Sequence, residues 1–157
     1  MKLIAVGRLK AGPERDLYER YAGRITPLAK QLGFMPLDVA ELRESSASTV
    51  DQRKAAEADA IRTKLPLPRF LIAFDERGKN LSSEPFAYQL RCARDEGRVP
   101  TCIIGGPDGL DGSLRKEADL VLSFGAMTLP HQLVRVLIVE QLYRAMTLLA
   151  GHPYHRS

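Results

Sequence analysis

Short apolar runs alternate with amphipathic segments along the whole chain. The apolar runs have the length of strands, and the most apolar of them, 70–74, is continuous. Such a run is typical of a central strand covered on both faces, and we expect it to end at Asp75, where a loop begins. Strands are predicted over 2–7, 34–42, 70–74, 101–104 and 120–123.

Between these strands, apolar residues recur at the spacing of helices. In the first helix Leu17, Tyr21 and Ile25 share one face, and Pro27 is expected to end the helix or to begin its exit. The second helix opens at a Ser/Thr cap, and the third ends at Gly97. Helices are predicted over 13–28, 48–64, 82–97, 113–118 and 130–150.

The order of these elements predicts the fold class. Strands and helices alternate, with no repeat and no linker rich in Pro, Gly or Ser, so residues 1–157 are expected to form one α/β domain. Its sheet is expected to be mostly parallel, with helices on both faces. Ligands of such sheets bind beyond the carboxyl ends of the strands. Three of these ends, 74–75, 104–109 and 123–128, could converge on one pocket.

The loop 105–109 is rich in glycine, which lets a ligand approach the backbone. A tight turn between strand and helix explains the same glycines equally well. The loop has neither the spacing of the Rossmann pattern nor the Gly-Lys-Ser/Thr of a phosphate-binding P-loop. The sequence therefore disfavours nucleotide hydrolysis.

The helix predicted over 130–150 is apolar nearly all round, so it should be buried. We hypothesise that one of its sides packs against a second copy of the chain, which gives a homodimer. Complete burial inside one subunit is the alternative. Within this helix Glu140 and Arg144 lie four residues apart and predict an ordinary ion pair.

Composition places the protein in a broad class. The chain has 157 residues, 45% of them hydrophobic and 27% charged, which suits a globular domain with a core. No apolar run suggests a signal peptide or approaches the ~18 residues of a membrane span. Cys92 and Cys102 lack metal-ligand spacing and are expected to be reduced thiols. We expect a cytoplasmic protein with no membrane partner and no metal, and its net charge of +4 modestly favours an anionic partner.

The last third of the chain holds the candidate chemistry. It contains all three histidines and three arginines, but only one carboxylate after Asp119. His131 and Arg135 lie one turn apart at the start of the last helix, where the helix N-terminus favours anions and Arg135 adds a fork of donors. We therefore predict a functional pair, although a histidine near a helix start is often only a local hydrogen-bonding residue.

Four motifs then make a family resemblance specific: Ile-Ile-Gly-Gly-Pro-Asp-Gly, Met-Thr-Leu-Pro-His-Gln-Leu-Val-Arg, Glu-Gln-Leu-Tyr-Arg-Ala and Tyr-His-Arg, over 103–109, 127–135, 140–145 and 154–156. With them the chain resembles, over its whole length, the ribosomal RNA large subunit methyltransferase H family, a minimal single-domain branch of the SPOUT methyltransferases. The resemblance implies a homodimer with a C-terminal trefoil knot that binds S-adenosylmethionine. It implies methylation of N3 of a pseudouridine in large-subunit (23S) rRNA of the assembled ribosome.

The resemblance also assigns the cofactor pocket. By motif, the pocket should comprise Phe74, Gly105, Phe124, Gly125, Ala126, Met127, Thr128 and Leu129. The sequence departs from the family at Gly125, where serine is common, so one hydroxyl is lost. Because much of the expected recognition is by backbone groups, we expect cofactor binding to persist.

The proposed reaction needs a proton acceptor, because the imide nitrogen of pseudouridine is only weakly acidic. His131 is the candidate general base, and Arg135 with the cationic donor would favour the reactive anion. Tyr154 or His155 could instead orient the uracil ring. Tyr154, His155 and Arg156 are predicted RNA contacts, with a tail merely docked on the body as the alternative. There are two alternative functions: a knotted enzyme that acts on another RNA such as tRNA, and a non-enzymatic ribosome-binding protein.

Overall fold

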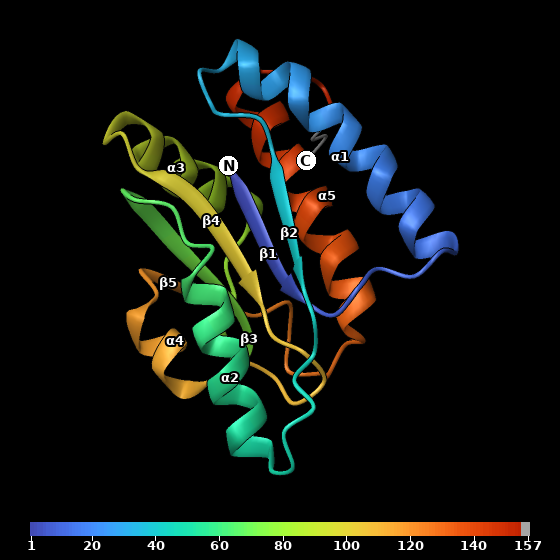
Figure 1. Ribbon diagram of the computed structural model, residues 1–157. Helices are drawn as coiled ribbons and strands as arrows, with labels where there is room; N and C mark the ends of the chain where they lie inside the picture. The colour runs from blue at the N-terminus through green and yellow to red at the C-terminus, as the bar shows by residue number, and fades with distance from the viewer. Residues whose placement is uncertain (155–157) are drawn as a thin grey trace.

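A five-stranded, wholly parallel sheet in the order β2-β1-β4-β3-β5 forms the centre of the molecule (Figure 1). The computed structural model describes residues 1–154. Its elements are β1 (Lys2–Val6), α1 (Pro13–Gln31), β2 (Asp38–Leu42), α2 (Val50–Arg62), β3 (Arg69–Lys79), α3 (Ser83–Asp95), β4 (Val99–Ile104), α4 (Gly112–Glu117), β5 (Leu120–Leu122) and α5 (His131–Leu149). The predicted parallel α/β fold class is confirmed.

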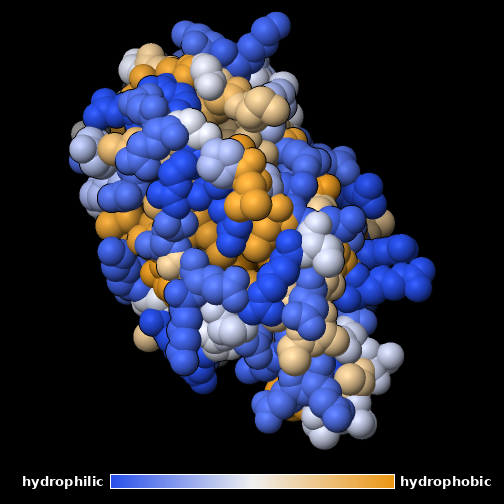
Figure 2. All heavy atoms as spheres, turned by 60° about the vertical axis from the view of Figure 1, so that its left-hand side comes forward, coloured by the Kyte–Doolittle hydropathy of each residue, from blue (hydrophilic) through white to orange (hydrophobic). Residues whose placement is uncertain are grey.

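Helices cover both faces of this sheet: α1, α3 and α5 pack on one face, and α2 and α4 on the other (Figure 1). Successive side chains of β1 alternate between the two layers, with Leu3 and Ala5 in the first and Ile4 and Val6 in the second. All four are at most 1% exposed. Burial on both faces is the reason why the central strands are apolar at consecutive positions. The face shown in Figure 2 is mostly hydrophilic, with apolar side chains grouped in its middle.

The first helix is longer than predicted, because Pro27 lies inside α1 and the helix continues to Gln31. A proline in a helix interior removes one backbone hydrogen bond and costs ~3 kcal/mol. Here Ile25 and Ala29, one turn apart on either side of the proline, are completely buried in the core. Packing of this face thus outweighs the local penalty, and the prediction that Pro27 ends the helix is wrong.

The third strand also runs beyond its predicted end at Asp75. Both Phe74 and Lys79 pair with Leu122 of β5, so the intervening residues bulge from the ladder. Gly78 permits the close approach, because a Cβ atom there would collide with the backbone of Leu122. The bulge carries residues 75–77 to the carboxyl end of the sheet, where they form a wall instead of a simple loop.

The last helix returns from the edge strand β5 to the first layer, where it packs against both α1 and α3 (Figure 1). Leu133 is the one large apolar side chain of α5 that is exposed. Burial within one subunit therefore accounts for the apolar character of α5, and this character does not by itself require a second copy. The homodimer and the trefoil knot stay predictions. No helix within residues 1–154 is long and apolar enough to cross a membrane.

Candidate active site

The three predicted strand ends converge on one cavity of about 240 Å³. The loop after β3 leads to the α3 face of the sheet and the loop after β4 to the α4 face, so a crevice opens where they diverge. The cavity is lined by 74–77, 104–110, 122–125 and 127–129, with Lys54, Arg115, His131 and Val134. All the predicted cofactor residues except Ala126 are among the lining residues.

Gly105 lies where the glycine loop folds tightly on itself. A Cβ atom on Gly105 would lie 2.5 Å from the backbone carbon of Gly109 and 2.6 Å from the nitrogen of Leu110. The amide of Gly109 donates to the carbonyl of Gly106 (2.9 Å), and Gly109 has a φ of 82°. The loop is therefore the tight turn that the sequence allowed, and the same turn forms a wall of the cavity.

The loop between β5 and α5 forms the facing wall. Its Gly125 has a φ of 142°, which side-chain-bearing residues rarely adopt, so the glycine at this position has a conformational reason. The Ser123 hydroxyl accepts from the amide of Gly125 (3.1 Å) and donates to its carbonyl (2.6 Å). The Phe124 ring stacks on Phe74, with ring centroids 5.2 Å apart. Local hydrogen bonds and one aromatic pair thus fix the shape of this loop.

The cavity is lined by three cations, Lys54, Arg77 and Arg115, and by three carboxylates, those of Asp75, Glu76 and Asp108. Arg115 pairs with the carboxylate of Asp75 at 3.0 Å and also donates to the carbonyl of Leu110 (2.8 Å). Lys54 and Arg77 have no acidic side chain within ion-pair distance among residues 1–154. The cavity wall therefore holds two cations available to a ligand.

His131 is the first residue of α5, half-buried at the cavity wall. Its side chain forms no hydrogen bond with any other residue between 1 and 154, so the alternative of a purely local hydrogen-bonding histidine finds no local partner there. The imidazole therefore lies at the cavity wall with no hydrogen-bond partner among these residues.

Arg135 does not line the cavity, in contrast to the expectation that it acts beside His131. Its side chain is 2% exposed, and its guanidinium donates to the carbonyls of Val6 (3.0 Å) and Gly7 (2.5 Å) and pairs with Glu41 (2.6 Å). The guanidinium turns inward because α5 packs across the end of β1, where these carbonyls need donors. Arg135 thus connects the first turn of α5 to the sheet.

Tyr154 is docked on its own chain. Its ring packs edge-on against Tyr143, with centroids 4.7 Å apart, and the Arg144 guanidinium lies 5.0 Å from its centroid. Its hydroxyl donates to Glu140 (3.3 Å), which forms the predicted ion pair with Arg144 at 2.6 Å. Tyr154 therefore agrees with the docked-tail alternative, while the predicted RNA contacts His155 and Arg156 lie outside the described residues.

Sequence reasoning missed the contributions of α2 and α4 to the site. Lys54 and Arg115 line the cavity, and Arg53 contacts the glycine loop through Asp108. Arg53 and Lys54 belong to a charged, Ala-rich helix, which is the pattern of an ordinary solvated face. Asp108, the partner of Arg53, is 55 residues away in the sequence, and Lys54 meets the other cavity residues only in the folded chain, so no local signal identifies either residue.

Comparison with known proteins defines the class that this fold and cavity represent. A family model described as "Predicted SPOUT methyltransferase" matches residues 1–155. The "Probable Methyltransferase" from Bordetella pertussis Tohama I shares the fold, with a TM-score of 0.53 and 16% identity over 92% of this chain and 93% of that one.

Closer relatives carry a more specific name. The "Ribosomal RNA large subunit methyltransferase H" of Methylobacterium radiotolerans is 55% identical over 99% of this chain and 96% of the relative. The protein of the same name from Rhodopseudomonas palustris (strain BisB5) is 52% identical over 100% and 99%. The chain therefore belongs to the SPOUT methyltransferases and, within them, to the family that its motifs indicated.

Proposed function

We propose that the protein methylates N3 of a pseudouridine in 23S rRNA of the assembled ribosome, in the cytoplasm, with S-adenosylmethionine as the methyl donor. The observation that carries the proposal is the cavity between the glycine loop and residues 122–129, with His131 at its wall. Full-length relatives named for rRNA methylation support the substrate class. Action on another RNA such as tRNA, and ribosome binding without catalysis, are the outcomes that would replace it.

The residues of the cavity fit S-adenosylmethionine. At Gly105 a side chain would collide with backbone, so the wall is formed by backbone groups that can bind the edge of an adenine. Phe124, Leu129 and Val134 supply apolar surface for the ring. When bound, the cofactor supplies a methyl group that moves from its sulfur to the ring nitrogen of the substrate.

The chain's own residues would prepare this nitrogen for reaction. His131 accepts the N3 proton, since its imidazole faces the cavity without a protein partner within residues 1–154. Lys54 and Arg77 favour the anionic imide through their positive charge. Arg135 acts at a distance, because its bonds to the end of β1 hold the turn that carries His131.

The position of Tyr154 supports a homodimer in which the tail serves the partner's cavity. Tyr154 packs on Tyr143, twelve residues along α5 from His131, which corresponds to about 18 Å at the rise of an α-helix. A tyrosine ring does not span that distance. Tyr154 therefore does not contact a nucleotide in the cavity of its own subunit, and in the proposed homodimer a second copy supplies the tail.

Mass mapping of rRNA tests the function. We expect a strain lacking the gene to lose one methylpseudouridine from 23S rRNA and to regain it on complementation. The purified protein should bind S-adenosylmethionine in calorimetric titration. A lost methyl group in tRNA would favour the second function, and absence of cofactor binding with retained ribosome binding would favour the third.

A mixing experiment separates the proton acceptor from the tail. His131→Gln should lower rRNA methylation by about 10²-fold or more, because it removes a general base. Arg156→Ala should also lower methylation, because it removes an RNA contact. Both variants should leave the cofactor Kd unchanged. Mixing the two variants and allowing subunit exchange should restore part of the activity, since a mixed dimer contains one cavity and one tail that are both intact. No recovery, or a monomer in light scattering, would contradict the shared site.

A further inference from the structure

We infer that Arg53 is a positioning residue for the cofactor cavity: it clamps the tip of the glycine loop to α2 and thereby sets the affinity for S-adenosylmethionine. The inference rests on the proposed cofactor. Arg53 does not line the cavity, whereas its partner Asp108 does. Its influence on a ligand therefore passes through the loop.

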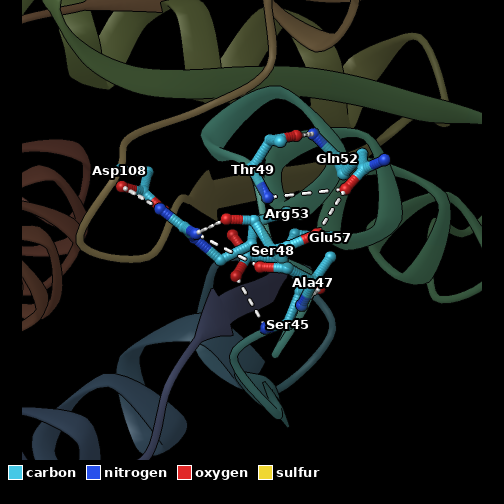
Figure 3. Close-up of polar contacts among 8 residues, drawn as sticks. All are labelled: Ser45, Ala47, Ser48, Thr49, Gln52, Arg53, Glu57 and Asp108. Carbon is cyan, nitrogen blue, oxygen red and sulfur yellow. Dashed lines mark hydrogen bonds and ion pairs between the residues drawn. The ribbon is translucent and has the colours of Figure 1, made fainter.

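The Arg53 guanidinium joins three segments (Figure 3). Its Nε and Nη2 donate to the two oxygens of Asp108, at 2.6 and 3.2 Å. Its Nη1 donates to the carbonyl of Ala47 at 3.2 Å. A planar guanidinium can hold a carboxylate with two bonds and a carbonyl with a third, which the point charge of a lysine cannot reproduce.

The start of α2 gives this guanidinium a fixed base. Thr49 and Gln52 form a reciprocal capping box at which the helix begins (Figure 3). One turn after Arg53, the 6% exposed Glu57 accepts the amide of Ser45 at 2.9 Å. A Cβ atom on Gly106 would lie 3.2 Å from the Glu57 carboxylate, so the glycine loop rests directly on α2. The clamp therefore joins the tip of the glycine loop to the first turns of α2.

Within residues 1–154, the hydrogen bonds that join residues 106–109 to another segment are those of Arg53, and one further bond, from Gly109 to Gly106, closes the turn itself. Asp108 lies in the turn from Gly106 to Gly109, and glycines give a free loop many accessible conformations. The bidentate bond selects one of them. The hydrogen bond from Arg53, together with its positive charge, lowers the pKa of the Asp108 carboxyl, so this bond persists at neutral pH. Without the clamp, the binding-competent fraction falls and the apparent Kd rises by the same factor. The methyl-transfer step itself is unaffected once cofactor is bound.

Calorimetric titration of S-adenosylmethionine tests the clamp. Arg53→Ala should raise the Kd about tenfold, as expected if the competent fraction falls to about a tenth. Arg53→Lys should recover only part of the loss. The matched control is Arg62→Ala, because Arg62 also lies on α2 and binds the carboxylate of Glu117 with two bonds (3.1 and 2.6 Å) away from the cavity. Its Kd should stay within about twofold of the unsubstituted protein, while both alanine variants keep a cooperative unfolding transition.

Two further readouts distinguish positioning from general destabilisation. In Arg53→Ala the KM for S-adenosylmethionine should rise while kcat on ribosomes stays near that of the unsubstituted protein. Arg53→Ala and Asp108→Ala together should cost no more affinity than the larger single loss, because both break one contact. An unchanged Kd in Arg53→Ala, or an equal loss in Arg62→Ala, would overturn the inference alone. Failure of the unsubstituted protein to bind S-adenosylmethionine would overturn the proposed function as well.

Discussion

Gly105→Ala is expected to weaken S-adenosylmethionine binding by tenfold or more and to lower the free energy of unfolding. The new Cβ atom would lie within 2.7 Å of three backbone atoms of Gly109 and Leu110, so no side-chain rotation can relieve the contact. Overpacking of this kind costs ~1–3 kcal/mol. If the new methyl group displaces the loop, and restoring its binding conformation costs ~1.4 kcal/mol, the affinity for S-adenosylmethionine falls tenfold. Calorimetry and chemical denaturation measure the two effects.

Gly23→Ala is the matched control for this substitution. Gly23 lies in α1, and nothing lies within 4 Å of the position that its Cβ would occupy. Alanine there should leave cofactor binding unchanged and stabilise the protein by ~0.5–1 kcal/mol, because glycine loses more backbone freedom in a helix. Equal cofactor affinity in Gly105→Ala and Gly23→Ala would refute the backbone-contact account of the cavity.

Arg135→Ala is expected to lower the free energy of unfolding by ~3–5 kcal/mol, the largest loss among these substitutions. The substitution leaves the carbonyls of Val6 and Gly7 without this donor and removes the ion-pair partner of Glu41. It also leaves a cavity in the layer between α5 and the sheet. Chemical denaturation at neutral pH measures the loss.

Arg144→Ala serves as its control, because Arg144 lies on the same helix and pairs with Glu140. The Arg144 side chain is 31% exposed, so solvent screens the pair and we expect a loss of at most about 1 kcal/mol. A similar loss in both variants would show that Arg135 is no more than a surface cation, and its role in holding the first turn of α5 would be wrong.

The family motifs predicted the cavity better than they predicted the roles of its neighbours. Gly105 and the loop after β5 line the cavity as expected, because both lie at strand ends that a parallel sheet brings to one edge. Arg135 was correctly placed one turn from His131, but a helix position does not specify which layer a long side chain enters. Arg53 and Lys54 were not predicted, because their roles depend on neighbours that are distant in the sequence.

Helices and strands were predicted well where the local sequence pattern was strong. Their ends were predicted wrongly where tertiary packing overrode the local preference. Pro27 is a local breaker, yet the buried Ile25 and Ala29 keep α1 continuous to Gln31. Likewise Asp75 marked a strand end, whereas pairing with β5 continues to Lys79 through a bulge. In both cases the free energy gained from tertiary contacts exceeded the free-energy cost of overriding the local preference.

The sequence alone determined the alternation of strands and helices, the parallel α/β class, the family and the loops that form the cavity. These features follow from periodicity, turn residues and short motifs, which act over a few neighbouring positions. Only the tertiary structure decided that α5 is covered by α1 and α3, that Arg135 turns inward, that Tyr154 docks on Tyr143 and that Arg53 holds Asp108. Each of these contacts joins segments distant in the chain or selects one direction for a flexible side chain, and packing alone makes that selection.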